Sequence, residues 1–220
     1  MGTHLALLHT APVNVATFEH LAEQQAPAVP VRHMLEVALL DDARRDGITP
    51  ELEQRIEQML GEAFAGGAST ILCTCSTIGG VAEALAEQHG WNVLRVDRAM
   101  AARAVELGQR ITVVAALEST IEPTHMLIAD EAIRAGKVVQ ADTVLCEGAW
   151  EAFEAGDIEG YHRRIAQCVR AEPHGDVIVL AQASMAGAAA LLGDLGVPVL
   201  SSPELGWEAA VRAYATPHSH

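Results

Sequence analysis

A cysteine flanked by hydroxyl residues follows a short apolar run in the first half of the chain. The run Thr70–Thr74 is typical of a buried strand, and the glycine pair Gly79–Gly80 predicts that the next helix begins only after it. Cys75 is therefore expected in a strand-to-helix turn, where backbone N–H groups attract anions and favour a thiolate. Ser76 and Thr77 add hydroxyl donors. This pattern suits a nucleophile, or an acid–base thiol beside a substrate carboxylate.

The other cysteines allow two further interpretations of this segment. Cys73 lies inside the expected strand, where a cysteine usually acts as a small buried apolar side chain, and the same alternative applies to Cys75. Cys73 and Cys75 with Cys146 and a histidine are also possible zinc ligands, but their spacing is not that of a zinc ribbon or finger. We therefore predict no metal site.

Short apolar runs alternate with helical patterns along the whole chain. The expected strands are 5–9, 29–34, 70–74, 92–96, 111–116, 138–145, 176–180 and 197–200. Such alternation predicts an α/β fold with parallel sheets and right-handed crossovers. We predict two pseudo-symmetric lobes, each a four-stranded parallel sheet flanked by helices. The first lobe spans 1–98, with the C-terminal helix 204–215 packing back onto it, and the second spans 99–203.

The two halves resemble each other at an offset of roughly a hundred residues. Ile71–Ser76 matches Ile178–Ala183 in place and character, which favours an internal duplication over generic α/β alternation. Ligands of parallel sheets bind beyond the carboxyl ends of the strands. The site is therefore expected in a cleft between the lobes, with Cys75 facing Gln182.

Further polar residues lie where strands are expected to end. His9 closes the first strand, as a proton carrier or as a hydrogen-bonded structural histidine. Gln182 either binds substrate or satisfies backbone groups. Ser184 is the counterpart of Thr77 in the second half.

Composition limits the partners of the protein. The chain has 14 Lys and Arg against 29 Asp and Glu, for a formal net charge of −15, which argues against nucleic acid and anionic membranes as partners. The start lacks the basic segment of a signal peptide, no apolar run reaches the length of a membrane span, and a cytoplasmic location with reduced thiols is expected. No glycine pattern forms a phosphate loop, so no nucleotide cofactor is predicted.

A resemblance to a known family adds to these inferences. Thr74–Thr77 resembles the Ala-Cys-Asn-Thr motif of the aspartate/glutamate/hydantoin racemase superfamily, and Leu180–Met185 resembles its second motif. Ala116–Thr124 resembles the loop that carries substrate-binding hydroxyls, which implies Thr120 as a ligand. The resemblance implies cofactor-independent chemistry at a carbon α to a carboxylate of a small amino acid or dicarboxylate.

The resembled mechanism uses two thiols on opposite faces of the substrate. Here Cys75 keeps the first position, while Gln182 occupies the second and cannot exchange a proton near neutral pH. Three hypotheses stay open: a racemase-like isomerase, a one-thiol lyase or decarboxylase, and a small-acid binding protein that has lost catalysis. The oligomeric state is open too, a homo-oligomer included. The predicted site residues are Cys75 and Gln182 as catalytic groups and His9, Ser76, Thr77, Thr120 and Ser184 as substrate ligands.

Overall fold

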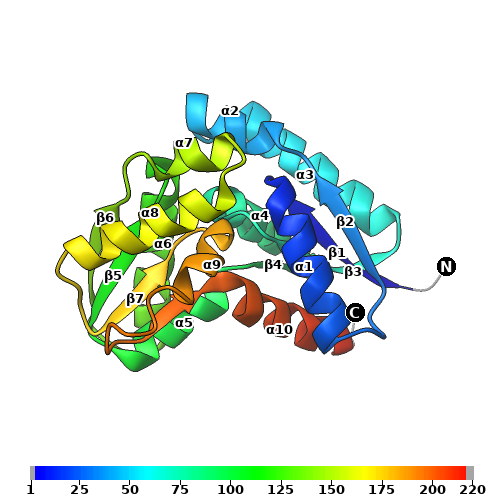
Figure 1. Ribbon diagram of the computed structural model, residues 1–220. Helices are drawn as coiled ribbons and strands as arrows, with labels where there is room; N and C mark the ends of the chain where they lie inside the picture. Colours follow the sequence, from blue (N-terminus) through cyan, green and yellow to red (C-terminus); the bar gives the residue numbers. More distant parts are fainter. Residues whose placement is uncertain (1–2, 217–220) are drawn as a thin grey trace. The chain divides into compact units, whose positions relative to one another are not determined.

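The computed structural model describes residues 3–216 and divides the chain into two compact units. The first comprises the chain up to residue 96 together with the segment from residue 203 onward, and the second comprises residues 97–202. Figure 1 shows the course of the chain through both. Each unit contains one four-stranded parallel sheet with helices around it, so the predicted fold class is confirmed.

The first sheet has the strand order β2-β1-β3-β4. Its strands are β1 (His4–His9), β2 (Val31–Leu35), β3 (Ala68–Cys73) and β4 (Val93–Arg95). The central strands β1 and β3 are almost wholly buried, as expected for strands that helices cover on both faces. Leu8 lies opposite Cys73 in the register. His9 and the segment after Cys73 therefore leave the sheet at the same carboxyl edge.

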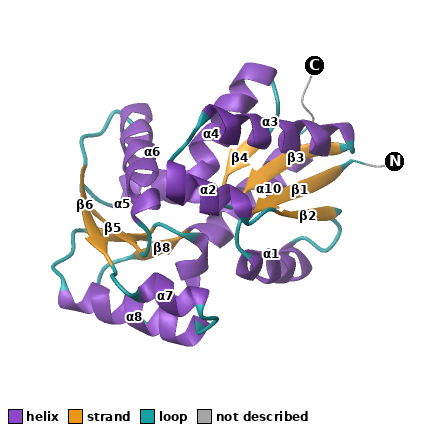
Figure 2. Cartoon of the chain, turned by 90° about the horizontal axis from the view of Figure 1, so that it is seen from above, coloured by secondary structure: helices purple, strands orange, loops and turns teal. Residues whose placement is uncertain are grey.

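Helices cover both faces of this sheet. They are α1 (Pro12–Gln25), α2 (Ala38–Asp46), α3 (Pro50–Ala65), α4 (Ser76–His89) and α10 (Ser202–Ala215). Figure 2 shows α1 and α3 on opposite sides of β1 and β2. On the α1 side, Leu5, Leu7, Phe18 and Trp207 form one buried apolar cluster. The Thr49 hydroxyl caps α3 by accepting a hydrogen bond from the backbone N–H of Leu52, at 3.3 Å.

The second sheet repeats this order as β6-β5-β7-β8. Its strands are β5 (Arg110–Ala115), β6 (Gln140–Leu145), β7 (Val177–Leu180) and β8 (Val199–Ser201). Its helices are α5 (Arg98–Leu107), α6 (Ile121–Arg134), α7 (Ala149–Glu154), α8 (Ile158–Ala171) and α9 (Ala186–Ala189), with the 3₁₀ turns η1 (Glu118–Thr120) and η2 (Ala183–Met185). Val114 lies opposite Leu180 in the register, as Leu8 lies opposite Cys73. The two units therefore share one topology, and Gln182 is the counterpart of Cys75.

The helix that follows the last strand of each sheet belongs to the other unit. Helix α5 follows β4 but packs on β7 and β8, and α10 follows β8 but lies in the first unit. Gly206 of α10 permits a close approach there, because a Cβ atom at that position would lie 2.4 Å from the carbonyl oxygen of Val96. The Tyr214 hydroxyl also donates to the carbonyl oxygen of Thr3, at 3.0 Å.

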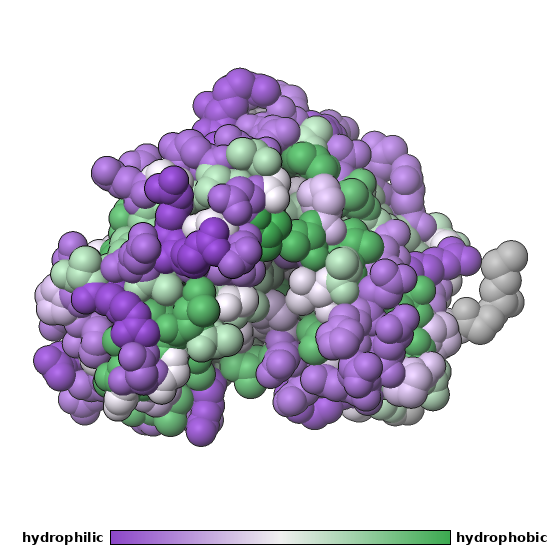
Figure 3. Space-filling model, in the orientation of Figure 1, coloured by the Kyte–Doolittle hydropathy of each residue, from purple (hydrophilic) through white to green (hydrophobic). Residues whose placement is uncertain are grey.

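The surface is rich in charged side chains. Figure 3 shows hydrophilic residues over α2, at the top of the view. Within residues 3–216, no helix combines the length and the apolar character that crossing a membrane requires.

Candidate active site

Cys75 immediately precedes α4, which begins at Ser76. The prediction that this helix starts only after Gly79–Gly80 is wrong. Both glycines lie inside α4, and Gly79 allows tight packing: a Cβ atom there would lie 3.1 Å from Cβ and Nε of Arg95. Gly79 therefore lets the helix approach a buried arginine and does not mark the end of a loop.

The first residues of α4 are buried together with the cysteine. Relative exposure is 7% for Cys75, 4% for Ser76 and 7% for Thr77. Backbone N–H groups in the first turn of a helix lack intrahelical partners and favour a negative charge nearby. Arg95 is buried beside this helix, with its nearer guanidinium nitrogen 4.0 Å from a Glu83 carboxylate oxygen. This carboxyl edge of the first sheet is thus a buried, polar environment suited to an anion.

A hydrogen-bonded relay of His33, His9 and Thr74 supports the turn that carries Cys75. His9 Nδ1 lies 2.8 Å from the Thr74 hydroxyl oxygen, and His9 Nε2 lies 2.9 Å from Nδ1 of His33. The Thr74 hydroxyl in turn donates to the carbonyl oxygen of Leu8, at 3.1 Å. The relay therefore joins β2, β1 and the residue directly before Cys75.

The direction of each bond follows from the chemistry of the groups. Because the Thr74 proton goes to a carbonyl, its oxygen accepts from His9 Nδ1–H. In a neutral His9 ring, Nε2 then accepts from His33 Nδ1–H. This pattern requires a neutral His9. Burial, and to a lesser extent the neighbouring His33, lowers the pKa of His9 to about 3. Burial also lowers the pKa of His33, against the opposing effect of Glu19.

His9 is fully buried and uses both ring nitrogens within the protein. Direct contact between His9 and a substrate, as the sequence suggested, would require one of these bonds to break. A neutral ring with this pKa is also a poor proton carrier near pH 7. The geometry favours a positioning role, in which His9 fixes Thr74 and hence the backbone of Cys75.

Asn14, in α1, is a candidate that the sequence analysis missed. Its Nδ2 donates to the carbonyl oxygen of Thr74, at 3.4 Å, and its Oδ1 has no hydrogen-bond partner among the described residues although Asn14 is only 5% exposed. The reverse amide orientation would set two acceptors against each other, so the free atom is the oxygen. The duplication could have revealed it, because Asn14 is the counterpart of Thr120.

In the second unit, Gln182 takes the place of Cys75. Both residues have an extended backbone and precede a helical turn. The Gln182 side-chain oxygen accepts from the backbone N–H of Ala116, at 3.0 Å, and its Nε2 has no partner in the described part of the chain. At 8% exposure, Gln182 thus holds a buried amide whose N–H₂ group is unused.

The remaining predicted ligands of the second unit are held in different ways. Thr120 is buried at the start of α6, and its carbonyl oxygen accepts from the Thr124 hydroxyl at 2.8 Å. The Ser184 hydroxyl lies 3.0 Å from the Tyr161 hydroxyl, and its carbonyl oxygen lies 2.9 Å from Nε2 of His162. Tyr161 and His162, on α8, are therefore supporting residues that the sequence analysis did not identify.

The structure gathers the predicted site residues into two sets, one in each unit. His9, Cys75, Ser76 and Thr77 share the carboxyl edge of the first sheet, while Thr120, Gln182 and Ser184 follow the strands of the second. In residues 3–216, no three His, Cys, Asp or Glu side chains are grouped as a metal site would need. Burial raises the pKa of Cys146, and its neighbour Cys168 raises it further.

Comparison with known proteins identifies the family. The family model described as Asp/Glu/Hydantoin racemase matches residues 15–210. The chain belongs to this family. Among curated protein sequences, none matches it.

Solved structures of racemases share the fold of this family member. Glutamate racemase isoform RacE1 from Bacillus anthracis has a TM-score of 0.70 at 14% identity, covering 96% of this chain and 80% of that chain. Aspartate racemase from Picrophilus torridus has a TM-score of 0.72 at 13% identity, covering 98% and 96% respectively. At such low identity these likenesses establish the fold alone.

A decarboxylase has the same fold. Unliganded arylmalonate decarboxylase has a TM-score of 0.59 at 18% identity, covering 100% of this chain and 95% of that chain. The fold of this racemase-family protein is therefore found with more than one reaction.

Proposed function

We propose that the protein is a cofactor-independent enzyme acting at a carbon α to a carboxylate of a small amino acid or dicarboxylate. Cys75 would be its acid–base or nucleophilic thiol. Membership of the racemase family supports this class of chemistry.

The observation that carries the proposal is the position of Cys75. It is the residue directly before a 14-residue helix, it is buried, and it lies next to two buried hydroxyl residues. A buried thiol on an apolar face would have no such surroundings. Here its backbone is held by the relay through Thr74, as a group that must meet one substrate atom requires.

The surrounding groups suit the charge that develops in such a reaction. Removing a proton α to a carboxylate places negative charge on the carboxylate oxygens. N–H groups of Ser76 and Thr77, with their hydroxyls, are the proposed donors to that charge. Asn14 Oδ1 is a buried acceptor suited to a substrate amine or hydroxyl. Thr120 and Ser184 are the proposed ligands from the second unit.

One observation favours a second candidate, a one-thiol lyase or decarboxylase. Gln182 stands at the counterpart of Cys75, and its oxygen is fixed by the N–H of Ala116. An amide in this position can donate a hydrogen bond to a carboxylate but cannot exchange a proton near neutral pH. Two-thiol racemisation is therefore disfavoured, whereas chemistry that needs a single thiol is not.

The primary test compares Cys75→Ser with Cys168→Ser. A panel of amino acids and dicarboxylates is incubated with each protein in D₂O and followed by proton NMR. We expect Cys75→Ser to lose roughly 10²- to 10⁴-fold in rate, while Cys168→Ser, whose cysteine lies on α8 outside the proposed site, keeps wild-type activity. Full activity of Cys75→Ser would refute the assignment.

The deuterium content of recovered substrate separates the reactions. Racemisation must introduce solvent deuterium at the α-carbon of recovered substrate, whereas a decarboxylase introduces it only into product. If a ligand binds but neither outcome appears, and binding persists after Cys75 is alkylated, the protein is a small-acid binding protein.

Gln182→Cys tests the role of the second position. If Gln182 replaces a second thiol, this substitution is expected to add proton exchange on the opposite face of the substrate. The shared cleft expected from the sequence stays a prediction. It requires Cys75 and Gln182 to lie on the order of 6 to 9 Å apart, since each must reach one carbon. A crystal structure with a bound small acid would measure that distance.

A further inference from the structure

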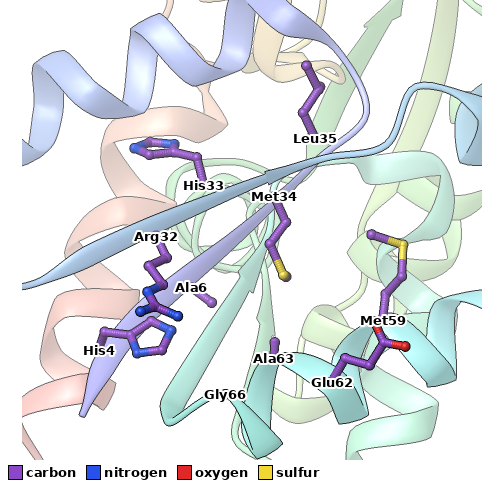
Figure 4. A pocket seen from close by; sticks show the side chains of 10 residues that line it. All are labelled: His4, Ala6, Arg32, His33, Met34, Leu35, Met59, Glu62, Ala63 and Gly66. Atoms are coloured by element: carbon purple, nitrogen blue, oxygen red, sulfur yellow. The ribbon is translucent and has the colours of Figure 1, made fainter. Parts of the chain in front are cut away.

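A pocket lies in the first unit, at the edge of the sheet where β2 has no outer neighbour. It has a volume of about 450 Å³ and lies between the edge strand and α3. Figure 4 shows Arg32 and His4 side by side at one end, Met34 near the middle, and Met59 with Glu62 on the wall formed by α3. His4 begins β1 and His9 ends it. The basic end of the pocket is therefore roughly 16 Å along the strand from the edge where Cys75 lies.

Three basic side chains line this pocket: His33, which is hydrogen-bonded to His9, and His4 and Arg32. His4 is only 7% exposed, yet its ring forms no hydrogen bond with any residue of 3–216. Arg32 likewise has no carboxylate partner in the described part of the chain, in a protein with 29 acidic residues. Burial lowers the pKa of His4, and the charge of Arg32 lowers it further. His4 and Arg32, the latter exposed, have no acidic partner of their own among the described residues, which leaves a place for an external anion.

The remaining walls specify the kind of anion. Ala6, Met34, Met59 and Ala63 provide an apolar floor, and flexible thioether side chains adapt to ligand shape. The single carboxylate of the lining, that of Glu62, accepts a hydrogen bond from Gln58 at 2.7 Å and so belongs to the helix surface. Its charge disfavours a second negative group at that end of the pocket.

We propose that this pocket is a binding site for a monocarboxylate with a short apolar chain. The carboxylate would accept hydrogen bonds from the Arg32 guanidinium and from His4, and the chain would lie on Met34 and Met59. An arginine fork matches a carboxylate with two parallel hydrogen bonds. The site differs from the proposed catalytic site in place and in ligand, because it has no thiol and a single anionic anchor.

The test uses hexanoate as the probe and the methionine methyl groups as local reporters. The protein is labelled with ¹³C-methyl methionine, and the signals of Met34 and Met59 are assigned with the variants Met34→Leu and Met59→Leu. We expect hexanoate to shift both signals in a saturable manner. The shifts report this pocket alone, so binding of hexanoate beside Cys75 does not mimic them.

Matched arginine variants and a shorter acid decide the outcome. Arg32→Gln is expected to weaken hexanoate binding at least roughly tenfold, whereas Arg103→Gln, an exposed arginine paired with Glu106, leaves it unchanged. Acetate, which lacks the chain, is expected to bind more weakly than hexanoate. Unmoved Met34 and Met59 signals, equal affinity in Arg32→Gln, or equal affinity for acetate would each overturn the proposal. Circular dichroism of the Arg32 variant confirms that it is folded.

Discussion

The turn at Cys75 and the turn at Gln182 have the same backbone course but different support. In the first unit, His33, His9 and Thr74 form a polar relay beneath the turn. In the second unit, the counterparts of His9 and Thr74 are Ala115 and Ala181. There the side chain of Gln182 itself bonds to the backbone.

This difference shows that the two halves keep one topology but fix the turn with different hydrogen bonds. The first unit holds a thiol on a turn whose preceding residue is fixed by buried hydrogen bonds. The second unit holds an amide whose N–H₂ group is available. Substitutions that alter this support should therefore have unequal effects in the two units.

Acid should weaken the first unit through His9. The unfolded chain takes up a proton on this histidine near pH 6.5, but the fold lowers its pKa to about 3. The unfolded state therefore binds more protons between these values, and stability falls as the pH drops through this window. The loss is on the order of 4 kcal/mol, measurable by urea unfolding at several pH values.

Substituting His9 isolates its contribution to the pH dependence of the free energy of unfolding. His9→Gln should flatten the pH dependence between pH 6.5 and 3, whatever its effect on stability at pH 7. His125→Gln, in which an exposed histidine bonded to Thr143 is replaced, should keep the wild-type slope. Equal slopes in wild type and His9→Gln would contradict a buried neutral His9.

Removing the Thr74 hydroxyl should lower the free energy of unfolding more than removing a comparable hydroxyl in the second unit. Thr74→Val leaves the buried Nδ1–H of His9 without its acceptor, while the carbonyl of Leu8 keeps the backbone N–H of residue 74 as a donor, so we expect a loss of about 2 kcal/mol in the free energy of unfolding. Thr124→Val removes one hydroxyl that only donates to its own helix, and about 1 kcal/mol or less is expected. Equal losses would show that the relay adds nothing.

The two glycines of α4 should respond in opposite directions. In Gly79→Ala the new methyl group would lie 3.1 Å from buried Arg95 atoms, and we expect a loss of about 1 kcal/mol after the gain in helix propensity. In Gly80→Ala the new methyl group would lie 3.5 Å from Nη1 of Arg95, an ordinary contact, so a gain of about 0.5 to 1 kcal/mol is expected. Thermal unfolding of both variants measures the difference. A stabilised Gly79→Ala would mean that Arg95 adjusts freely.

The smallest effect is expected at Gln182. Gln182→Met removes the bond to the Ala116 N–H but also removes a buried donor without a partner. These two changes oppose each other, and the free energy of unfolding should stay within about 1 kcal/mol of wild type. A loss of several kcal/mol in chemical denaturation would instead indicate that the amide is a structural element.

The sequence by itself determined the fold class, the repeat and the position of the turns. Apolar runs of strand length alternating with helical patterns are local features, and the likeness of Ile71–Ser76 to Ile178–Ala183 relates Cys75 to Gln182 before any coordinates are known. The Thr49-Pro50 helix start was also predictable, because capping depends on neighbouring residues.

Only the tertiary structure decided what surrounds the turns. His9 meets His33 and Thr74 across 24 and 65 residues of chain, and Asn14 reaches Thr74 across 60. Such contacts depend on which strands become neighbours in the sheet, and this order cannot be read from the spacing of residues along the chain. The same cause explains the error at Gly79–Gly80. In the sequence a glycine pair usually indicates a loop or a helix end, whereas here Gly79 lets Arg95 of the neighbouring strand β4 pack closely against the helix.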